Sequence, residues 1–283
     1  MTLTGPDLAA LAASHDIIKL GMHADDARRR LHGARTTFVR VANVVAAPGA
    51  PIGVPPAAGE VRIVGRPASR VEAVARVTAV KAAAGGRPLS GFMLADLEQL
   101  SVTEHVTLRA LLEELCAAGL ELVAEAPLDQ LQDPRRSIEE VNIAGLALAR
   151  LTVNQLPGAD PIAWFSEVSA LQRTVAVIRS FAPLPRQTNP AVPSTGYEDI
   201  RRVALARMVI DNIPSIQVDW SLYGPKLAQV ALTMGADDVD GVSPEEEQGE
   251  GRRRAPLAEI QRNIRAAGLE PVERNGRYET IAR

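Results

Sequence analysis

Short runs of β-branched and apolar residues alternate with longer amphipathic stretches, and this alternation restricts the fold more than any other feature of the chain. It is typical of βα units, in which helices cover a parallel sheet. The pattern predicts eight strands, at Phe38–Val45, Val61–Gly65, Leu89–Leu94, Leu120–Ala124, Ala149–Asn154, Thr174–Phe181, Ile216–Ser221 and Ala236–Val239. It also predicts helices at Gly5–Leu31, Ala68–Ala84, Thr103–Ala118, Ser137–Leu146, Asp160–Leu171, Gly196–Asn212, Tyr223–Met234 and Ala258–Ala267.

Eight strands with intervening helices predict an α/β fold, a (β/α)8 barrel of the TIM type. A doubly wound open sheet is the alternative, because the pattern does not separate a closed sheet from an open one. We expect an N-terminal helical extension over residues 1–35 and the barrel over residues 36–242. Residues 243–283 are expected to form a charged loop and a C-terminal closing helix.

Charge balance and residue usage exclude several classes of protein. Lys and Arg number 31 against 34 Asp and Glu, so the basic surplus typical of nucleic-acid-binding proteins is missing. The longest uncharged run, Val41–Gly59, contains four prolines and cannot form a helix that spans a membrane. No targeting segment is visible at the N-terminus. We therefore expect a cytoplasmic protein that contacts neither nucleic acid nor membrane.

The most specific pattern in the chain is STGYEDIRRVALARMVIDNIPSIQVDWSLYGPKLAQVALTMGADDVDG, at Ser194–Gly241. It resembles the closing segment of the menaquinone-pathway radical SAM enzymes aminofutalosine synthase and dehypoxanthine futalosine cyclase. LGMHADDARRRLHG (Leu20–Gly33), GEVRIVG at the second strand and EPVERNGRYE near the C-terminus resemble the same family. The resemblance covers nearly the whole chain. It implies a radical SAM barrel, a fold that in this family holds a 4Fe–4S cluster and SAM.

The cluster motif of that family is missing here. The family holds its cluster on a CxxxCxxC loop after the first strand, whereas the corresponding loop in this chain, Ala42–Gly59, has no cysteine. Cys116 is the only cysteine, and a cluster with one iron open to SAM needs three thiolates. We therefore expect no iron–sulfur cluster and no resident cofactor. SAM stays open as a ligand, although Arg66 replaces a glycine in the turn that approaches SAM in the family.

Candidate site residues follow from the rule that functional groups of barrels gather at the C-terminal ends of the strands. The catalytic candidates are Glu98 and Asp238, whose carboxyl groups could act as general acid or base. We expect no metal site, because Asp238 and Asp240 face one side of a strand and Asp237 faces the other. The substrate-binding candidates are Arg66, Asn154, Gln217, Asp219, Trp220 and Asp237.

Three arginines, Arg40, Arg62 and Arg179, lie inside predicted strands between apolar neighbours. A buried guanidinium group needs a partner, since an unpaired buried charge is costly. The partners are either interior carboxylates, with Asp96, Glu125 and Asp219 as candidates, or an anionic group of a substrate.

The resemblance and the missing motif together favour a cluster-less homologue of the futalosine-pathway enzymes. Such a protein would bind a nucleoside or a carboxylated intermediate without radical chemistry of its own. It could instead assist an active relative, as a homo-oligomer or as a hetero-oligomer with a cysteine-bearing homologue. The alternative is an enzyme with re-purposed acid–base chemistry on a futalosine-like nucleoside.

Overall fold

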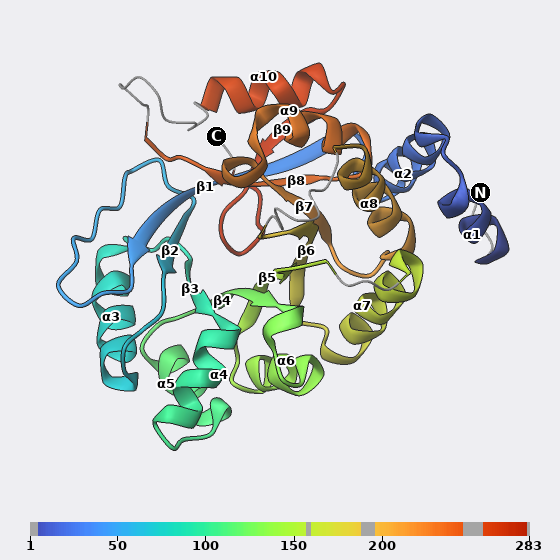
Figure 1. Cartoon of the computed structure of the whole chain (residues 1–283). Coiled ribbons are helices and arrows are strands. Elements are labelled where there is room, and N and C mark those ends of the chain that lie inside the picture. The colour runs from blue at the N-terminus through green and yellow to red at the C-terminus, as the bar shows by residue number, and fades with distance from the viewer. Residues whose placement is uncertain (1–4, 157–159, 188–195, 246–256, 282–283) are drawn as a thin grey trace.

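The computed structural model describes residues 5–156, 160–187, 196–245 and 257–281, and within them eight parallel strands close a barrel (Figure 1). Strands β2 to β8 pair in chain order, and β1 pairs with both β8 and β2. The barrel prediction is therefore confirmed, and the open-sheet alternative is wrong. The strands are β1 Arg35–Val45, β2 Glu60–Val64, β3 Leu89–Met93, β4 Leu122–Pro127, β5 Ala147–Val153, β6 Ile178–Pro185, β7 Ser215–Asp219 and β8 Asp238–Val242.

Helices cover the outside of the barrel, except between β1 and β2, where residues 46–59 form a loop (Figure 1). Side-chain caps fix several helix starts: Ser69 accepts from the backbone N–H of Glu72 at α3, and Asp133 accepts from that of Arg136 at α6. No helix in the described ranges has the length and apolarity needed to cross a bilayer. The helices are α1 Gly5–Ala13, α2 Ile17–His32, α3 Arg70–Ala83, α4 Leu94–Thr103, α5 Leu108–Ala117, α6 Pro134–Ile143, α7 Pro161–Val175, α8 Gly196–Val209, α9 Trp220–Thr233 and α10 Leu257–Ala266, with a short 3-10 turn at Leu128–Gln130.

Several predicted elements have different bounds in the structure, and the helix predicted at Gly5–Leu31 is the two helices α1 and α2. The helix predicted at Thr103–Ala118 is α5, which begins only at Leu108. Helix α4 precedes it and was not predicted; it begins directly at the end of β3, and its leucines are buried in the core. The strand predicted at Thr174–Phe181 begins too early, since α7 continues through Val175. Ala176 then adopts a left-handed conformation (φ 54°), which ends the helix before β6.

A ninth strand and the segment after it close the N-terminal end of the barrel. The sequence pattern predicted neither of them. Strand β9 (Glu270–Glu273) pairs in parallel with the first half of β1, Arg35–Phe38, whereas β2 pairs with the second half, Val41–Val45. Residues 274–280 fold back against the barrel, and Arg274 forms an antiparallel bridge with Thr280. The predicted closing helix is present as α10, and residues 246–256 of the predicted charged loop lie outside the described residues.

The interior of the barrel is polar. On β2, Glu60 and Arg62 point inward, where Arg62 reaches Asp240 across the barrel. On β8, Asp238 and Asp240 are both fully buried inside, while Val239 packs in the hydrophobic core outside. The prediction that Asp238 and Asp240 share one face of a strand is confirmed. They lie in different layers, with Asp238 nearer the N-terminal end of the barrel and Asp240 nearer the C-terminal end.

Candidate functional site

Seven charged side chains form one alternating series inside the barrel, which we call the charge series. Each guanidinium group lies between two carboxylates, and a carboxylate stands at either end. Five of the seven barrel strands β2 to β8 contribute to it directly, and one member follows β6. In order, the series is Glu60, Arg62, Asp240, Arg150, Glu125, Arg186 and Asp219.

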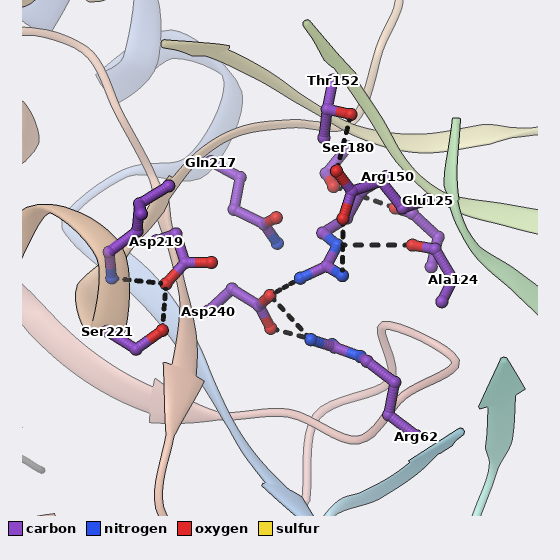
Figure 2. A network of polar contacts seen from close by, with 12 residues as sticks. Arg62, Ala124, Glu125, Arg150, Thr152, Ser180, Gln217, Asp219, Ser221 and Asp240 are labelled. Carbon is purple, nitrogen blue, oxygen red and sulfur yellow. Dashed lines mark hydrogen bonds and ion pairs between the residues drawn. The ribbon is translucent and has the colours of Figure 1, made fainter. Parts of the chain in front are cut away.

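The first part of the charge series centres on Asp240. Arg62 donates from Nε to Glu60 at 2.7 Å and from Nη2 to Asp240 at 2.9 Å. Arg150 also donates to Asp240, and Figure 2 shows the two guanidinium groups converging on that carboxylate. Burial and the nearby charge of Arg62 lower the pKa of Arg150 to about 10. Arg150 therefore remains protonated at neutral pH, and Asp240 has two cationic partners.

The second part of the series reaches the C-terminal end of the barrel. Arg186 donates to Glu125 Oε1 at 3.1 Å and to Asp219 Oδ2 at 2.7 Å. The hydroxyl of Ser221 donates to Asp219 Oδ1 at 2.6 Å (Figure 2). Burial alone would raise the pKa of both carboxyl groups, but Arg186 and Arg150 hold the pKa of each below its ordinary value. Glu125 and Asp219 are therefore ionised at neutral pH.

A cavity of about 520 Å³, here called the mouth cavity, lies at the C-terminal ends of the strands. Its inner wall contains Arg62, Arg150, Glu125, Arg186 and Asp219 of the charge series. The other lining residues include Asn43, Gly53, Pro55, Ser221, Gly241 and Glu245. This is the end of the barrel at which TIM-type enzymes hold their ligands. A ligand here would meet guanidinium N–H groups, carboxylate oxygens and the amide of Asn43.

A second polar group, the floor cluster, closes the opposite end of the barrel. Arg274 donates to both oxygens of Asp238, at 2.6 and 2.7 Å, and Gln217 donates to Asp238 Oδ2 at 2.6 Å. The Arg274 guanidinium also stacks 3.8 Å from the ring centre of Tyr278. The Tyr278 hydroxyl lies 2.8 Å from Ser180 Oγ. Asp238 is therefore sealed beneath the C-terminal segment.

Among the predicted site residues, Asp219 is the one that lines the mouth cavity in the described structure. Gln217 lies in the floor cluster instead. Asp237 points out of the barrel, where it accepts from Arg207 of α8. Trp220 begins α9 with 2% of its surface exposed and packs in the hydrophobic core. It therefore presents no stacking face to the mouth cavity.

The other predicted residues lie farther from the mouth cavity. Arg66 and Glu98 line a separate outer groove of about 900 Å³ beside α4, α5 and α6, where Glu98 accepts from the hydroxyl of Ser137. Asn154 lies just after β5, and its backbone N–H donates to Asp129. The structure thus separates the two catalytic candidates, with Glu98 on the outside and Asp238 in the floor cluster.

The strand arginines have three different environments. Arg40 pairs with Glu273 of β9 at 2.7 Å, and Arg62 pairs with Glu60 and Asp240. Interior ion pairing is therefore confirmed for these two, but with partners other than the expected Asp96, Glu125 and Asp219. For Arg179 it is wrong, since its side chain is exposed on the outside of the barrel. The prediction missed Arg150, although it also lies between apolar neighbours in ALARLTV. The signal used for Arg62 would have identified it.

The loop after β1 does not fit an iron–sulfur cluster. Residues 46–59 contain no cysteine, and two arginines fix the loop from outside. Arg76 donates to the carbonyl of Ala50 at 2.9 Å, and Arg87 donates to two further loop carbonyls at 2.9 and 3.0 Å. Cys116 lies on α5 outside the barrel. Across the described residues, no three His, Cys, Asp or Glu side chains are grouped so that they could hold a metal ion.

A half-buried histidine, His32, gives the protein a predicted pH dependence. Burial lowers the pKa of His32, Asp237 opposes this, and Arg207 and Arg28 add to it. The unfolded chain therefore binds more protons here than the folded one, so the free energy of unfolding should fall as the pH drops below about 6.5, by at most about 1.4 kcal/mol per pH unit.

Urea unfolding of His32→Gln between pH 5 and pH 7.5 tests this expectation. The variant should lose part of the pH dependence over that range. The matched control is His15→Gln, because His15 is exposed. An identical slope in His32→Gln and in the wild type would contradict the assignment.

Comparison with known proteins finds a family match for the C-terminal part of the chain. Residues 184–283 match the family model described as CofH/MqnC C-terminal region. The cyclic dehypoxanthine futalosine synthase of Streptomyces coelicolor is 28% identical over 207 residues, which cover 66% of this chain and 52% of that protein. Aminodeoxyfutalosine synthase of Thermus thermophilus is 37% identical over 108 residues, 35% of this chain and 28% of that enzyme. The matches thus span about a quarter to a half of the length of these relatives.

Solved structures support the fold. Methylornithine synthase (PylB) superposes with a TM-score of 0.68 and 14% identity, over 96% of this chain and 94% of that one. The hydrogenase maturase HydG gives a TM-score of 0.64 and 11% identity, over 96% of this chain and 72% of that one. At these identities the likeness concerns the barrel architecture. The chain is a distant homologue of the radical SAM enzymes aminodeoxyfutalosine synthase and futalosine cyclase, with a CofH/MqnC-type C-terminal region and a single cysteine.

Proposed function

We propose that this protein is a cluster-less homologue of the futalosine-pathway radical SAM enzymes that binds a nucleoside or carboxylated intermediate in its mouth cavity and performs no radical chemistry of its own. The observation that carries the proposal is the mouth cavity itself. It has about 520 Å³ of space and a polar inner wall. Ligand sites of this volume are usual for small molecules. The missing thiolates remove the means of holding a cluster in the family's way.

The side chains of the mouth cavity would bind and orient such a ligand. Arg186 uses three of its five N–H groups on carboxylates, which leaves two to donate to a carbonyl or hydroxyl oxygen. Glu125 and Asp219 are ionised and can accept hydrogen bonds from ribose hydroxyls. The amide of Asn43 adds a donor and an acceptor to the lining. Gly53 and Pro55, from the loop of residues 46–59, also line the cavity.

The acid–base alternative finds little support in the geometry. Asp238 is fully buried and held by two hydrogen bonds from Arg274, so a substrate cannot reach it. Glu98 lies in the outer groove, away from the charge series. General acid–base catalysis needs a group within hydrogen-bond reach of the reacting atom. Neither carboxyl group meets that condition for a ligand in the mouth cavity.

Isothermal titration tests the proposal. The purified protein is titrated separately with SAM, aminodeoxyfutalosine and dehypoxanthine futalosine. We expect one of the two futalosine compounds to bind and SAM not to bind. Arg186→Gln should weaken that binding about tenfold or more, because it removes hydrogen bonds from a charged donor. The matched control is Arg179→Gln, a change to an exposed arginine outside the barrel.

Binding that is equal in the wild type and Arg186→Gln would place the ligand elsewhere and contradict the proposed site. Binding of none of the three compounds would contradict the ligand-binding role. It would favour the assisting role instead, in which the chain forms a complex with a cysteine-bearing relative. Size-exclusion chromatography of the mixed proteins would then test that role.

A further inference from the structure

The charge series contains one more carboxylate than guanidinium. Its three arginines alternate with four carboxylates, and each arginine already contacts two of them. No arginine of the series therefore has a positive charge left without a carboxylate partner. The arginines of the mouth cavity differ in this respect from those of a phosphate site, where guanidinium groups face the ligand unpaired.

The two carboxylates of the charge series that line the cavity, Glu125 and Asp219, are the most accessible carboxylates of the series. The side chains of Glu125 and Asp219 are 14% and 11% exposed, whereas that of Asp240 is fully buried behind them. An anionic ligand group that approached Arg186 would have to lie beside both carboxylates or displace one of them. Like charges brought together in a desolvated site are strongly disfavoured.

We infer that the mouth cavity rejects anionic ligand groups and accepts an uncharged, hydroxyl-rich one. Hydroxyls suit this wall, since they donate to carboxylate oxygens and accept from the remaining N–H groups of Arg186. The inference rests on the proposed function and narrows it to an unphosphorylated nucleoside moiety. The carboxylate of a carboxylated intermediate would have to remain outside the cavity.

The test measures anion binding directly, with inorganic phosphate as the probe in a phosphate-free buffer. The wild type is compared with Asp219→Asn by isothermal titration. The variant removes the terminal negative charge and leaves Arg186 with one carboxylate partner, Glu125. Asparagine also keeps a side-chain oxygen that can cap α9, as Asp219 does through the N–H of Leu222. We expect Asp219→Asn to bind phosphate at least about tenfold more tightly than the wild type does.

The double variant Asp219→Asn, Arg186→Gln serves as the control and should lose that gain. Equal phosphate affinity in the wild type and Asp219→Asn would overturn the inference. So would a gain that persists in the double variant, because the phosphate would then lie away from the charge series. Glu125→Gln offers a second way to remove a lining carboxylate if Asp219→Asn fails to fold. Since the probe is phosphate, a failure here is distinct from a failure to bind futalosine compounds.

Discussion

Asp240→Asn should lower the free energy of unfolding by about 3–5 kcal/mol, the range seen when one partner of a buried ion pair is removed. Asp240 is fully buried and is the carboxylate between Arg62 and Arg150. Without its charge, the two guanidinium groups lie close together with nothing negative between them. The pKa of Arg150 is already lowered to about 10 by burial and by Arg62, so the site has little tolerance for further positive charge. Urea denaturation at neutral pH measures the loss.

A surface ion pair provides the matched control for Asp240→Asn. Glu139 accepts from Arg135 one helical turn away on α6, and the Arg135 side chain is 68% exposed. Glu139→Gln should change the free energy of unfolding by less than about 1 kcal/mol, as exposed pairs do. If both substitutions cost the same, the charge series does not contribute to stability in the way its burial indicates.

The sequence predicted the barrel because its strands and helices have strong and different periodicities. Seven of the eight predicted strands overlap the observed ones by several residues, and the exception is the last, Ala236–Val239, which shares two residues with β8. Local pattern carries this information, since apolar residues on the outside of a parallel barrel must face helices. The errors in element boundaries arose where the local backbone conformation, and not the hydrophobic pattern, decides where a helix ends, as at Ala176.

The site was harder to predict, because a barrel interior joins residues that are far apart in the chain. Asp240 and Arg62 are separated by 178 positions, and Arg150 and Asp240 by 90. Strand-end position selected Asp219, which lines the mouth cavity, and also Arg66, Asn154 and Glu98, which lie outside it. Side-chain direction at a strand end depends on where the strand stops, and the sequence does not fix that to within one residue.

The C-terminal segment shows the same limit. EPVERNGRYE was recognised as a family pattern, but its physical role is visible only in the folded protein. A Cβ atom at position 276 would lie only 2.8 Å from Glu60 Cγ, which is too close for any residue but glycine. The turn therefore packs directly against the start of β2. Arg274 and Tyr278 flank this glycine and enter the floor cluster. A short strand of four residues gives too little periodicity to be predicted.

Arg274→Ala is the second substitution expected to have a large effect, again about 3–5 kcal/mol in the free energy of unfolding. Arg274 makes two hydrogen bonds to Asp238 and stacks on Tyr278, so its removal leaves a buried carboxylate without its cation. The matched control is Arg277→Ala in the same turn, because Arg277 is partly exposed and pairs with Glu121 at the surface. That control should cost less than about 1 kcal/mol.

The pH dependence of the Arg274→Ala loss separates charge from packing. In the wild type, burial would raise the pKa of Asp238, but Arg274 holds it below its ordinary value. Asp238 then contributes stability above the unfolded pKa of about 4, and this contribution disappears as the pH falls. In the variant, the charge of Arg274 no longer counteracts burial, so the pKa of Asp238 rises. Ionisation of Asp238 at neutral pH then destabilises the fold. The difference between wild type and variant should therefore be larger at pH 7 than at pH 4, whereas a loss of packing alone would give the same difference at both.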